Sequence, residues 1–240
     1  MTILLTNDDG ILSPGIQALA RILEPEHDVW LLAPEGERSG QSHKITIEDP
    51  IRVQAWGERQ FACSGSTADC VILGMLDALP ARPDVVISGI NRGPNLGTDI
   101  VFSGTASGAR QAGYMGVCGI AVSINAFSEP LHYDYVAEFV RDNLDEFVGL
   151  WNRDIFININ APNIDGSHPK WEYTRPALRL YEDKLLQFRS PSKADYYFLD
   201  GRPAETALEP GTDWHTVNEG IVSVGLVHIH PSGFIPGENR

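Results

Sequence analysis

Short runs of β-branched and leucine residues alternate with helical patterns through the first half of this 240-residue chain. The apolar runs cover residues 3–6, 29–33, 85–88 and 119–124. Such alternation is typical of βαβ units, in which successive strands lie parallel and helices cover the sheet. The chain is therefore predicted to be an α/β protein whose core is a Rossmann-like, three-layer parallel sheet.

Four helices are predicted from their start signals and apolar spacing. One begins at residues 13–14, where serine precedes proline, and a second is capped by Ser66 with Asp69 three residues later. A third begins near Thr105. A fourth covers residues 132–151, where apolar side chains recur at three- and four-residue steps and are expected to face the sheet.

Two further regions are predicted to be β-rich. Residues 43–48 and 51–55 alternate apolar and polar side chains, which indicates an antiparallel hairpin inserted after the second strand. Beyond residue 160, proline, aromatic residues and short extended runs dominate. We predict a catalytic core over residues 1–160 and a C-terminal β-rich arm over residues 161–240, whose last strand returns to the core. Exposed aromatic strands need cover, so a homodimer or homotetramer built through the arm is a hypothesis.

The acidic composition limits the partners that the protein can have. With a formal net charge of -14, the chain lacks the basic clusters on which a stable nucleic-acid complex depends. The same charge repels a phosphate substrate, so a phosphate-binding site needs local positive potential. A bound divalent cation would provide it.

The chain carries no signal of export or membrane insertion. Its first residues have no basic region and reach acidic residues early, and no apolar run approaches the roughly 20 residues of a membrane span. A cytoplasmic protein without a membrane partner is expected. Cys63, Cys70 and Cys118 lie in apolar stretches without metal-ligand spacing, so they are expected to be reduced, buried thiols.

Asp8 and Asp9 follow the first predicted strand directly, where ligands bind in open parallel sheets. Two adjacent carboxylates can serve one site if the chain turns there, which Gly10 permits. A hard divalent cation would neutralise their mutual repulsion. An Asx turn that caps a helix is the alternative interpretation.

Polar loops follow two other predicted strands at the same edge. The loop after the second strand offers the hydroxyl of Ser39, and the glycine-rich segment after the third offers the amides of Asn91 and Asn95. Amide and hydroxyl oxygens suit a cation that two carboxylates already balance. We therefore predict one divalent cation per subunit, bound by Asp8, Asp9, Ser39 and Asn91.

Ser103, Gly104 and Thr105 open the third predicted helix. Free backbone N–H groups, two hydroxyls and the helix dipole make such a turn suited to phosphate. We predict that these three residues and Asn95 bind the phosphoryl oxygens, and that Asp8, Asp9 and Asn95 are catalytic. The alternative interpretation, without a function, is a loop followed by an ordinary helix cap.

Together these patterns predict a metal-dependent phosphomonoesterase. Attack by metal-activated water and attack assisted by Asp8 both stay open. The alternative function is a magnesium-binding phospho-receiver or nucleotide-binding module that does not hydrolyse its ligand. A receiver would need a phosphoacceptor aspartate at the end of the middle strand, but this chain has Ser88 and Gly89 there. A nucleotide-cofactor oxidoreductase would need a glycine-rich fingerprint where Asp8 and Asp9 stand.

At these residues the sequence resembles the SurE survival-protein family of acid phosphatase-type 5′/3′-nucleotidases. The shared motifs are ILLTNDDG at 3–10, APE at 33–35, RSG at 38–40, ADCV at 68–71, SGINRGPNLGTD at 88–99, SGT at 103–105 and NINAP at 158–162. The chain differs from the usual family sequence at Ala106 and at residues 111–113.

The resemblance implies a Rossmann-like core with a C-terminal arm exchanged between subunits. It also implies hydrolysis of nucleoside monophosphates with magnesium or manganese. The family's metal ligands align with Asp8, Asp9, Ser39 and Asn91, all of which are intact.

Overall fold

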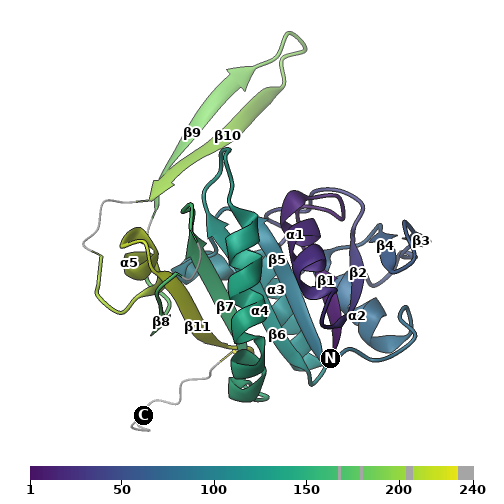
Figure 1. Cartoon of the computed structure of the whole chain (residues 1–240). Coiled ribbons are helices and arrows are strands. Elements are labelled where there is room, and N and C mark those ends of the chain that lie inside the picture. Colours follow the sequence, from purple (N-terminus) through teal and green to yellow (C-terminus); the bar gives the residue numbers. More distant parts are fainter. Residues whose placement is uncertain (167–168, 179–180, 204–207, 232–240) are drawn as a thin grey trace, which may run out of the picture.

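The computed structural model describes residues 1–166, 169–178, 181–203 and 208–231. The described elements form a large sheet with helices on both faces and a separate hairpin (Figure 1). The helices are α1 (Pro14–Leu23), α2 (Thr67–Leu76), α3 (Gly104–Tyr114), α4 (Tyr133–Leu150) and α5 (Asp213–Asn218), with a 3-10 helix η1 (Gly97–Val101). The strands are β1 (Thr2–Thr6), β2 (Asp28–Pro34), β3 (Val53–Ala55), β4 (Gln60–Cys63), β5 (Val85–Arg92), β6 (Cys118–Asn125), β7 (Ile155–Pro162), β8 (Trp171–Thr174), β9 (Tyr181–Arg189), β10 (Asp195–Pro203) and β11 (Val222–His228).

The main sheet has nine strands in the order β3-β4-β2-β1-β5-β6-β7-β11-β8. All neighbours from β4 to β7 pair in parallel, which confirms the predicted α/β architecture. The strands β2, β1 and β5 are adjacent, so the loops that leave their carboxyl ends emerge side by side. This adjacency brings together polar segments that are far apart in the sequence.

Alternation of side chains along the strands divides the core into two layers. On β1, Ile3 and Leu5 pack in a cluster with residues of α1 and α4, such as Leu19. Leu4 points to the other face and packs with Val71 of α2. All five side chains are fully buried, and burial of each contributes on the order of 1.5–3 kcal/mol. The helices thus cover both faces of the sheet, as Figure 1 shows.

The predicted helix starts are confirmed. Pro14 lies in the first turn of α1, and α4 spans Tyr133–Leu150 inside the predicted range. At α2 the Ser66 hydroxyl accepts a hydrogen bond from the Asp69 N–H over 3.2 Å, and the Asp69 carboxylate accepts one from the Ser66 N–H over 2.9 Å. This reciprocal pair is the capping box that the sequence predicts.

An antiparallel hairpin follows β2 as predicted, but the predicted pairing of residues 43–48 with 51–55 is wrong. β3 pairs antiparallel with β4 instead, through a turn in which the Trp56 N–H donates to the Gln60 carbonyl. Residues 43–48 form no strand. Their polar backbone groups contact the start of α2, because the Thr46 N–H donates to Asp69 and the Lys44 carbonyl accepts from Ser66. Side-chain alternation in the sequence could not show that these backbone groups bond to α2 instead of to a neighbouring strand.

The third predicted strand is too short. β5 continues past residue 88 to Arg92, with a register shift between Ser88 and Asn91 in its pairing with β6. Gly89 adopts a positive φ of 143°, and a Cβ there would lie 2.3 Å from the Val122 carbonyl oxygen. Glycine therefore permits the irregularity, and the extension carries Asn91 further along the sheet edge.

The C-terminal residues contribute to both sheets. β11 pairs antiparallel with β7 and parallel with β8, so these two strands extend the main sheet. β9 and β10 form an antiparallel hairpin that projects away from the sheet (Figure 1). Among the described residues, no helix combines the length and apolarity that crossing a bilayer would require.

Candidate active site

The turn after β1 directs two carboxylates away from the core. The side chain of Asn7 closes the turn, because its Nδ2 donates to the Gly10 carbonyl over 2.9 Å and its Oδ1 accepts from the Gly10 N–H over 3.1 Å. Gly10 has a positive φ of 100°, which glycine adopts without strain. The Asx turn considered as an alternative thus belongs to Asn7. Asp8 and Asp9 keep their carboxylates for other contacts.

Asp8 is buried against the start of α3. Its Oδ1 accepts a hydrogen bond from the Thr105 hydroxyl. A Cβ on Gly104 would lie 2.7 Å from Asp8 Oδ2, so only glycine leaves room for this carboxylate. Burial raises the pKa of Asp8, and the hydrogen bond from Thr105 acts in the opposite direction. The carboxylate therefore lies where ionisation needs a compensating positive charge.

Asp9 is half-buried beside Asp8. Its Oδ2 accepts a hydrogen bond from the Arg92 N–H over 3.2 Å. Burial raises the pKa of Asp9 to about 6, the N–H of Arg92 opposes this rise, and the charge of Asp8 adds to it. Two acids with raised pKa values at the end of one strand are characteristic of a functional site.

The loop after β2 lies against this turn. The Arg38 N–H donates to the Asp8 carbonyl over 2.7 Å and so fixes the loop beside the two aspartates. The Ser39 hydroxyl donates to Glu37 over 3.1 Å, which leaves its oxygen lone pairs available to a cation. The negative charge of Glu37 contributes to the raised pKa values of both aspartates.

Asn91 and Asn95 are oriented by their amide groups. Asn91 Nδ2 donates to the Gly93 carbonyl over 2.8 Å, and its Oδ1 accepts no hydrogen bond from the residues that the structure describes. Asn95 is buried, and its Nδ2 donates to the Ser123 hydroxyl over 2.8 Å. The Asn95 carbonyl accepts hydrogen bonds from the side chains of Asn158 and Asn160, which the sequence analysis did not place at the site.

The start of α3 carries the remaining predicted site residues, Ser103, Gly104 and Thr105. The Ser103 hydroxyl accepts from the Ala106 N–H over 3.0 Å and caps the helix. Thr105 is fully buried, and its hydroxyl contacts Asp8. Neither Gly104 nor Thr105 is among the described residues that line the neighbouring cavity.

A cavity of about 750 Å³ brings most of the predicted site residues together. Asp8, Asp9, Ser39, Asn91, Asn95 and Ser103 all line it. The other described residues that line it were not predicted from the sequence, and they are Glu37, Gly40, Arg92, Gly93, Pro94, Asp99, Phe102, Phe127, Tyr181, Asp183, Leu199 and Gly201. The last four belong to the β9–β10 hairpin, so the hairpin supplies one wall.

The donor set fits a hard divalent cation. Asp8 and Asp9 provide carboxylate oxygens, Ser39 a hydroxyl and Asn91 an amide oxygen without a donor, which are the ligands that magnesium and manganese favour. Within the described ranges no three histidine, cysteine, aspartate or glutamate side chains cluster at metal-binding distance. Such a cation would thus depend on the neutral oxygen ligands as well as on the two carboxylates.

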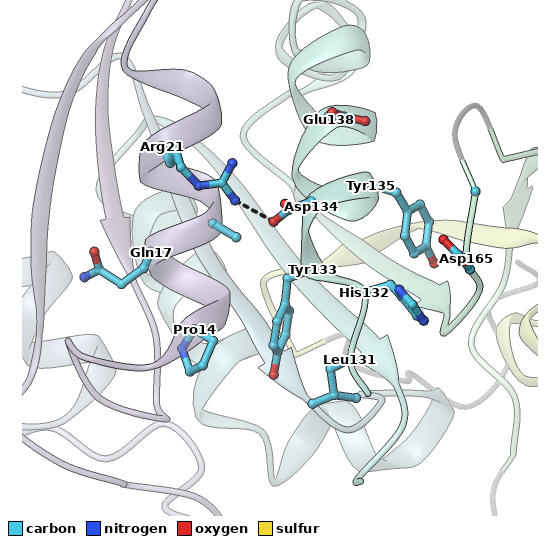
Figure 2. A pocket seen from close by; sticks show the side chains of 12 residues that line it. Pro14, Gln17, Arg21, Leu131, His132, Tyr133, Asp134, Tyr135, Glu138 and Asp165 are labelled. Carbon is cyan, nitrogen blue, oxygen red and sulfur yellow. Dashed lines mark hydrogen bonds and ion pairs between the residues drawn. The ribbon is translucent and has the colours of Figure 1, made fainter. Parts of the chain in front are cut away.

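A second cavity, of about 680 Å³, lies between α1 and α4 (Figure 2). Arg21 and Asp134 form an ion pair between the two helices, and Tyr133 and His132 come from the start of α4. Both partners of the ion pair are more than half exposed, so the pair contributes little stability. None of the predicted site residues lines this cavity. The cavity at the strand ends is therefore the candidate active site.

Comparisons with known proteins identify the relatives of the chain. A family model described as Survival protein SurE matches residues 3–183. The chain is 42% identical over 235 residues to the 5'-nucleotidase SurE of Thermosipho melanesiensis, covering 95% of this chain and 92% of the relative. It is 38% identical over 242 residues to the 5'-nucleotidase SurE of Geotalea daltonii, with 95% and 93% covered. The crystal structure of the SurE protein from Aquifex aeolicus superimposes with a TM-score of 0.86 at 33% identity, covering 97% of this chain and 95% of that one.

Proposed function

This chain belongs to the Survival protein SurE family, and we propose that it is a nucleotidase that hydrolyses nucleoside 5′-monophosphates to nucleoside and phosphate. We extend the proposal to nucleoside 3′-monophosphates, which present the same phosphate monoester. The observation that carries it is the single cavity lined by Asp8, Asp9, Ser39, Asn91 and Ser103. The names of the curated relatives support the same reaction class.

We propose that one divalent cation, magnesium or manganese, is held by Asp8, Asp9, Ser39 and Asn91. When bound, it would supply the positive field and the Lewis acidity that screen phosphate charge and activate water. The electrostatics of the cavity support this assignment. Among the residues that the structure describes, five acidic ones line it, namely Asp8, Asp9, Glu37, Asp99 and Asp183, together with one arginine, Arg92. A phosphate dianion would be repelled from this lining unless a cation offset it.

The phosphoryl group is assigned to the start of α3 and to Asn95. Ser103 and Asn95 line the cavity. α3 has 11 residues and begins at Gly104 and Thr105, and the positive end of its helix dipole attracts anions. Oriented donors of this kind stabilise charge that develops in a transition state.

The nucleophile is water or the carboxylate of Asp8. Attack by water on phosphorus releases the nucleoside in one displacement and inverts the configuration at phosphorus. Attack by Asp8 forms an aspartyl phosphate that water then cleaves, and two displacements retain the configuration. A substrate with a chiral, isotopically labelled thiophosphate distinguishes the routes, since inversion assigns the attack to water and retention assigns it to Asp8.

The proposed reaction is tested by phosphate release from a panel of nucleoside 5′- and 3′-monophosphates, with magnesium, with manganese and with a chelator. We expect the chelator to abolish turnover and Asp8→Asn to lower kcat/KM by about a hundredfold or more. Asp134→Asn removes a carboxylate from the other cavity and is the matched control, with activity near that of the unmodified protein. Nucleotide binding without phosphate release would favour the non-hydrolytic binding module, and equal rates in all conditions would reject the assignment.

We also propose that the β9–β10 hairpin joins subunits into a homodimer or homotetramer. Its strands leave large apolar side chains exposed on the single chain, including Leu185, Phe188, Phe198 and Leu199. Leu185 and Leu199 lie on one face of the hairpin, and Phe188 and Phe198 lie on the other. Exposed apolar side chains of this kind mark an interface, and a copy of the chain related by two-fold symmetry would present the same side chains. Sedimentation equilibrium tests the proposal. Phe188→Ser with Phe198→Ser should dissociate the assembly, and a monomeric unmodified protein at all concentrations would contradict it.

A further inference from the structure

A third cavity, of about 680 Å³, lies between α3, the end of β11 and the loop that follows Ser42. Its basic side chains are Arg110, His43, His228 and His230. No aspartate or glutamate is among the described residues that line it, and it shares no lining residue with the candidate active site. The segment after β2 contributes to both cavities, because Ser39 and Gly40 line the candidate active site and His43 and Ile45 line the third cavity.

Ser42 fixes that loop between the two cavities. Its N–H donates to the Phe102 carbonyl over 3.2 Å, and its hydroxyl donates to the Val101 carbonyl over 2.6 Å. Phe102 lines the candidate active site and Val101 lines the third cavity. The wall between them is therefore built from defined contacts, and a ligand on one side need not enter the other.

Arg110 is the central charge of the third cavity. Its guanidinium lies 5.2 Å from the ring centroid of Phe156 and makes no ion pair with any residue that the structure describes. Burial lowers the pKa of Arg110, and the nearby Tyr114 acts against that decrease. A half-buried cation without an anionic partner is costly, and an anionic ligand would offset the cost.

The rings of His43, Tyr114 and His230 form a connected row in this cavity. His43 Nε2 and Gln111 Oε1 lie 2.9 Å apart, so the next residue of α3 positions the imidazole. The ring centroids of His43 and Tyr114 are 5.8 Å apart, and those of Tyr114 and His230 are 5.5 Å apart. Imidazole N–H groups and a guanidinium thus share one cavity with aromatic and aliphatic walls.

We propose that this cavity is a second binding site, distinct from the candidate active site, for an anion that carries a phosphate group. The guanidinium fork matches a phosphate with two parallel hydrogen bonds, and the imidazole N–H groups of His228 and His230 add further donors. Ile45, Val101 and Tyr114 provide an apolar wall beside these donors. The volume lies within the roughly 300–1,000 Å³ typical of small-molecule sites, so an organic phosphate such as a nucleotide fits.

Calorimetric titration of the full chain in a chelator tests the site without any need for catalysis. The probes are inorganic phosphate, adenosine 5′-monophosphate and adenosine. We expect phosphate-bearing probes to bind and adenosine not to bind. Tighter binding of the nucleotide than of inorganic phosphate would identify an organic phosphate as the ligand, and equal affinity would identify phosphate itself.

Two variants assign the binding to this cavity. Arg110→Gln removes the central charge, and Gln111→Glu keeps the side-chain shape while adding a carboxylate beside His43. Each should weaken phosphate binding by about tenfold or more, as loss of a charge-assisted contact does. Arg153→Gln removes one exposed positive charge elsewhere and should bind within about twofold of the unmodified protein. Arg110 packs on Phe156, so Arg110→Gln could weaken phosphate binding through a folding defect. Gln111→Glu keeps this packing and therefore tests the site independently. Unchanged affinity in a folded Gln111→Glu protein, or no binding by the unmodified protein, would overturn the proposal.

Discussion

The hydroxyl of Thr105 donates a hydrogen bond to the buried carboxylate of Asp8, 97 residues earlier in the chain. This contact links the start of α3, assigned to phosphate, with the turn after β1, assigned to the cation. The two halves of the proposed site are thus held by one side-chain contact rather than by neighbouring positions in the sequence.

Thr105→Val should lower kcat/KM by about tenfold to a hundredfold, because a hydrogen bond to a charged group is worth roughly 1.5–3 kcal/mol. The Thr105 hydroxyl favours the ionised form of Asp8, so its loss should raise the pKa of Asp8 further. The acid limb of the pH profile of kcat/KM should therefore move to higher pH. Thr105→Ser retains the hydroxyl and should keep the original profile, and identical profiles for the valine and serine variants would contradict this role.

Asp9→Asn should stabilise the metal-free protein at neutral pH. The pKa of Asp9 is raised to about 6 in the folded state, so the fold loses stability as the pH rises from the unfolded-state pKa of about 3.9 to about 6, and the loss is complete above that pH. The variant should gain about 1–2 kcal/mol at pH 7.5 and little at pH 4, after a discount for solvent screening of a partly exposed group. Thermal melts in chelator between pH 4 and 8 measure the difference. A variant that is less stable than the unmodified protein at pH 7.5 would contradict the claim that the ionised Asp9 carboxylate destabilises the fold.

Gly104→Ala should reduce activity sharply while leaving the fold intact. The added Cβ would lie 2.7 Å from Asp8 Oδ2, and the carboxylate would have to move. Gly149 is also helical, and a Cβ there would meet nothing within 4 Å, so Gly149→Ala is the matched control. That control should raise stability by about 0.5–1 kcal/mol at full activity. Equal kinetics for the two alanine variants would contradict a tight contact at Gly104.

Tyr181→Phe should raise KM for nucleotides by about two- to tenfold with little change in kcat, since an exposed hydrogen bond is worth roughly 0.5–1.5 kcal/mol. The Tyr181 hydroxyl donates to Asp99 over 2.6 Å where the hairpin meets the cavity. Tyr173→Phe removes a comparable exposed bond, from Tyr173 to Glu146, and should leave KM unchanged. Steady-state kinetics on both variants check this prediction. The same KM for both variants would show that the Tyr181–Asp99 contact of the hairpin does not contribute to substrate binding.

The sequence was sufficient to predict the turn at Asp8 and Asp9 because local signals define it. A buried strand, a carboxylate pair and a glycine follow one another, and the parallel sheet brings the other loops to the same edge. The capping box of Ser66 and Asp69 was visible for the same reason, since both partners lie within one helical turn.

Contacts between distant residues could not be predicted in this way. Asp213 is buried and accepts hydrogen bonds from the N–H groups of Gly97 and Ala177, which lie 116 and 36 residues away. The hairpin wall at Tyr181 and the pairing of β3 with β4 likewise depend on tertiary packing, which outweighs local alternation of side chains.

Titration of the metal-free protein with manganese, followed by calorimetry, tests the central assignment most directly. We expect one cation per subunit, with affinity at least about tenfold weaker in Asp8→Asn and in Asp9→Asn, and unchanged affinity in Asp134→Asn. Manganese binding of equal strength in all four proteins, or no binding by the unmodified protein, would contradict it.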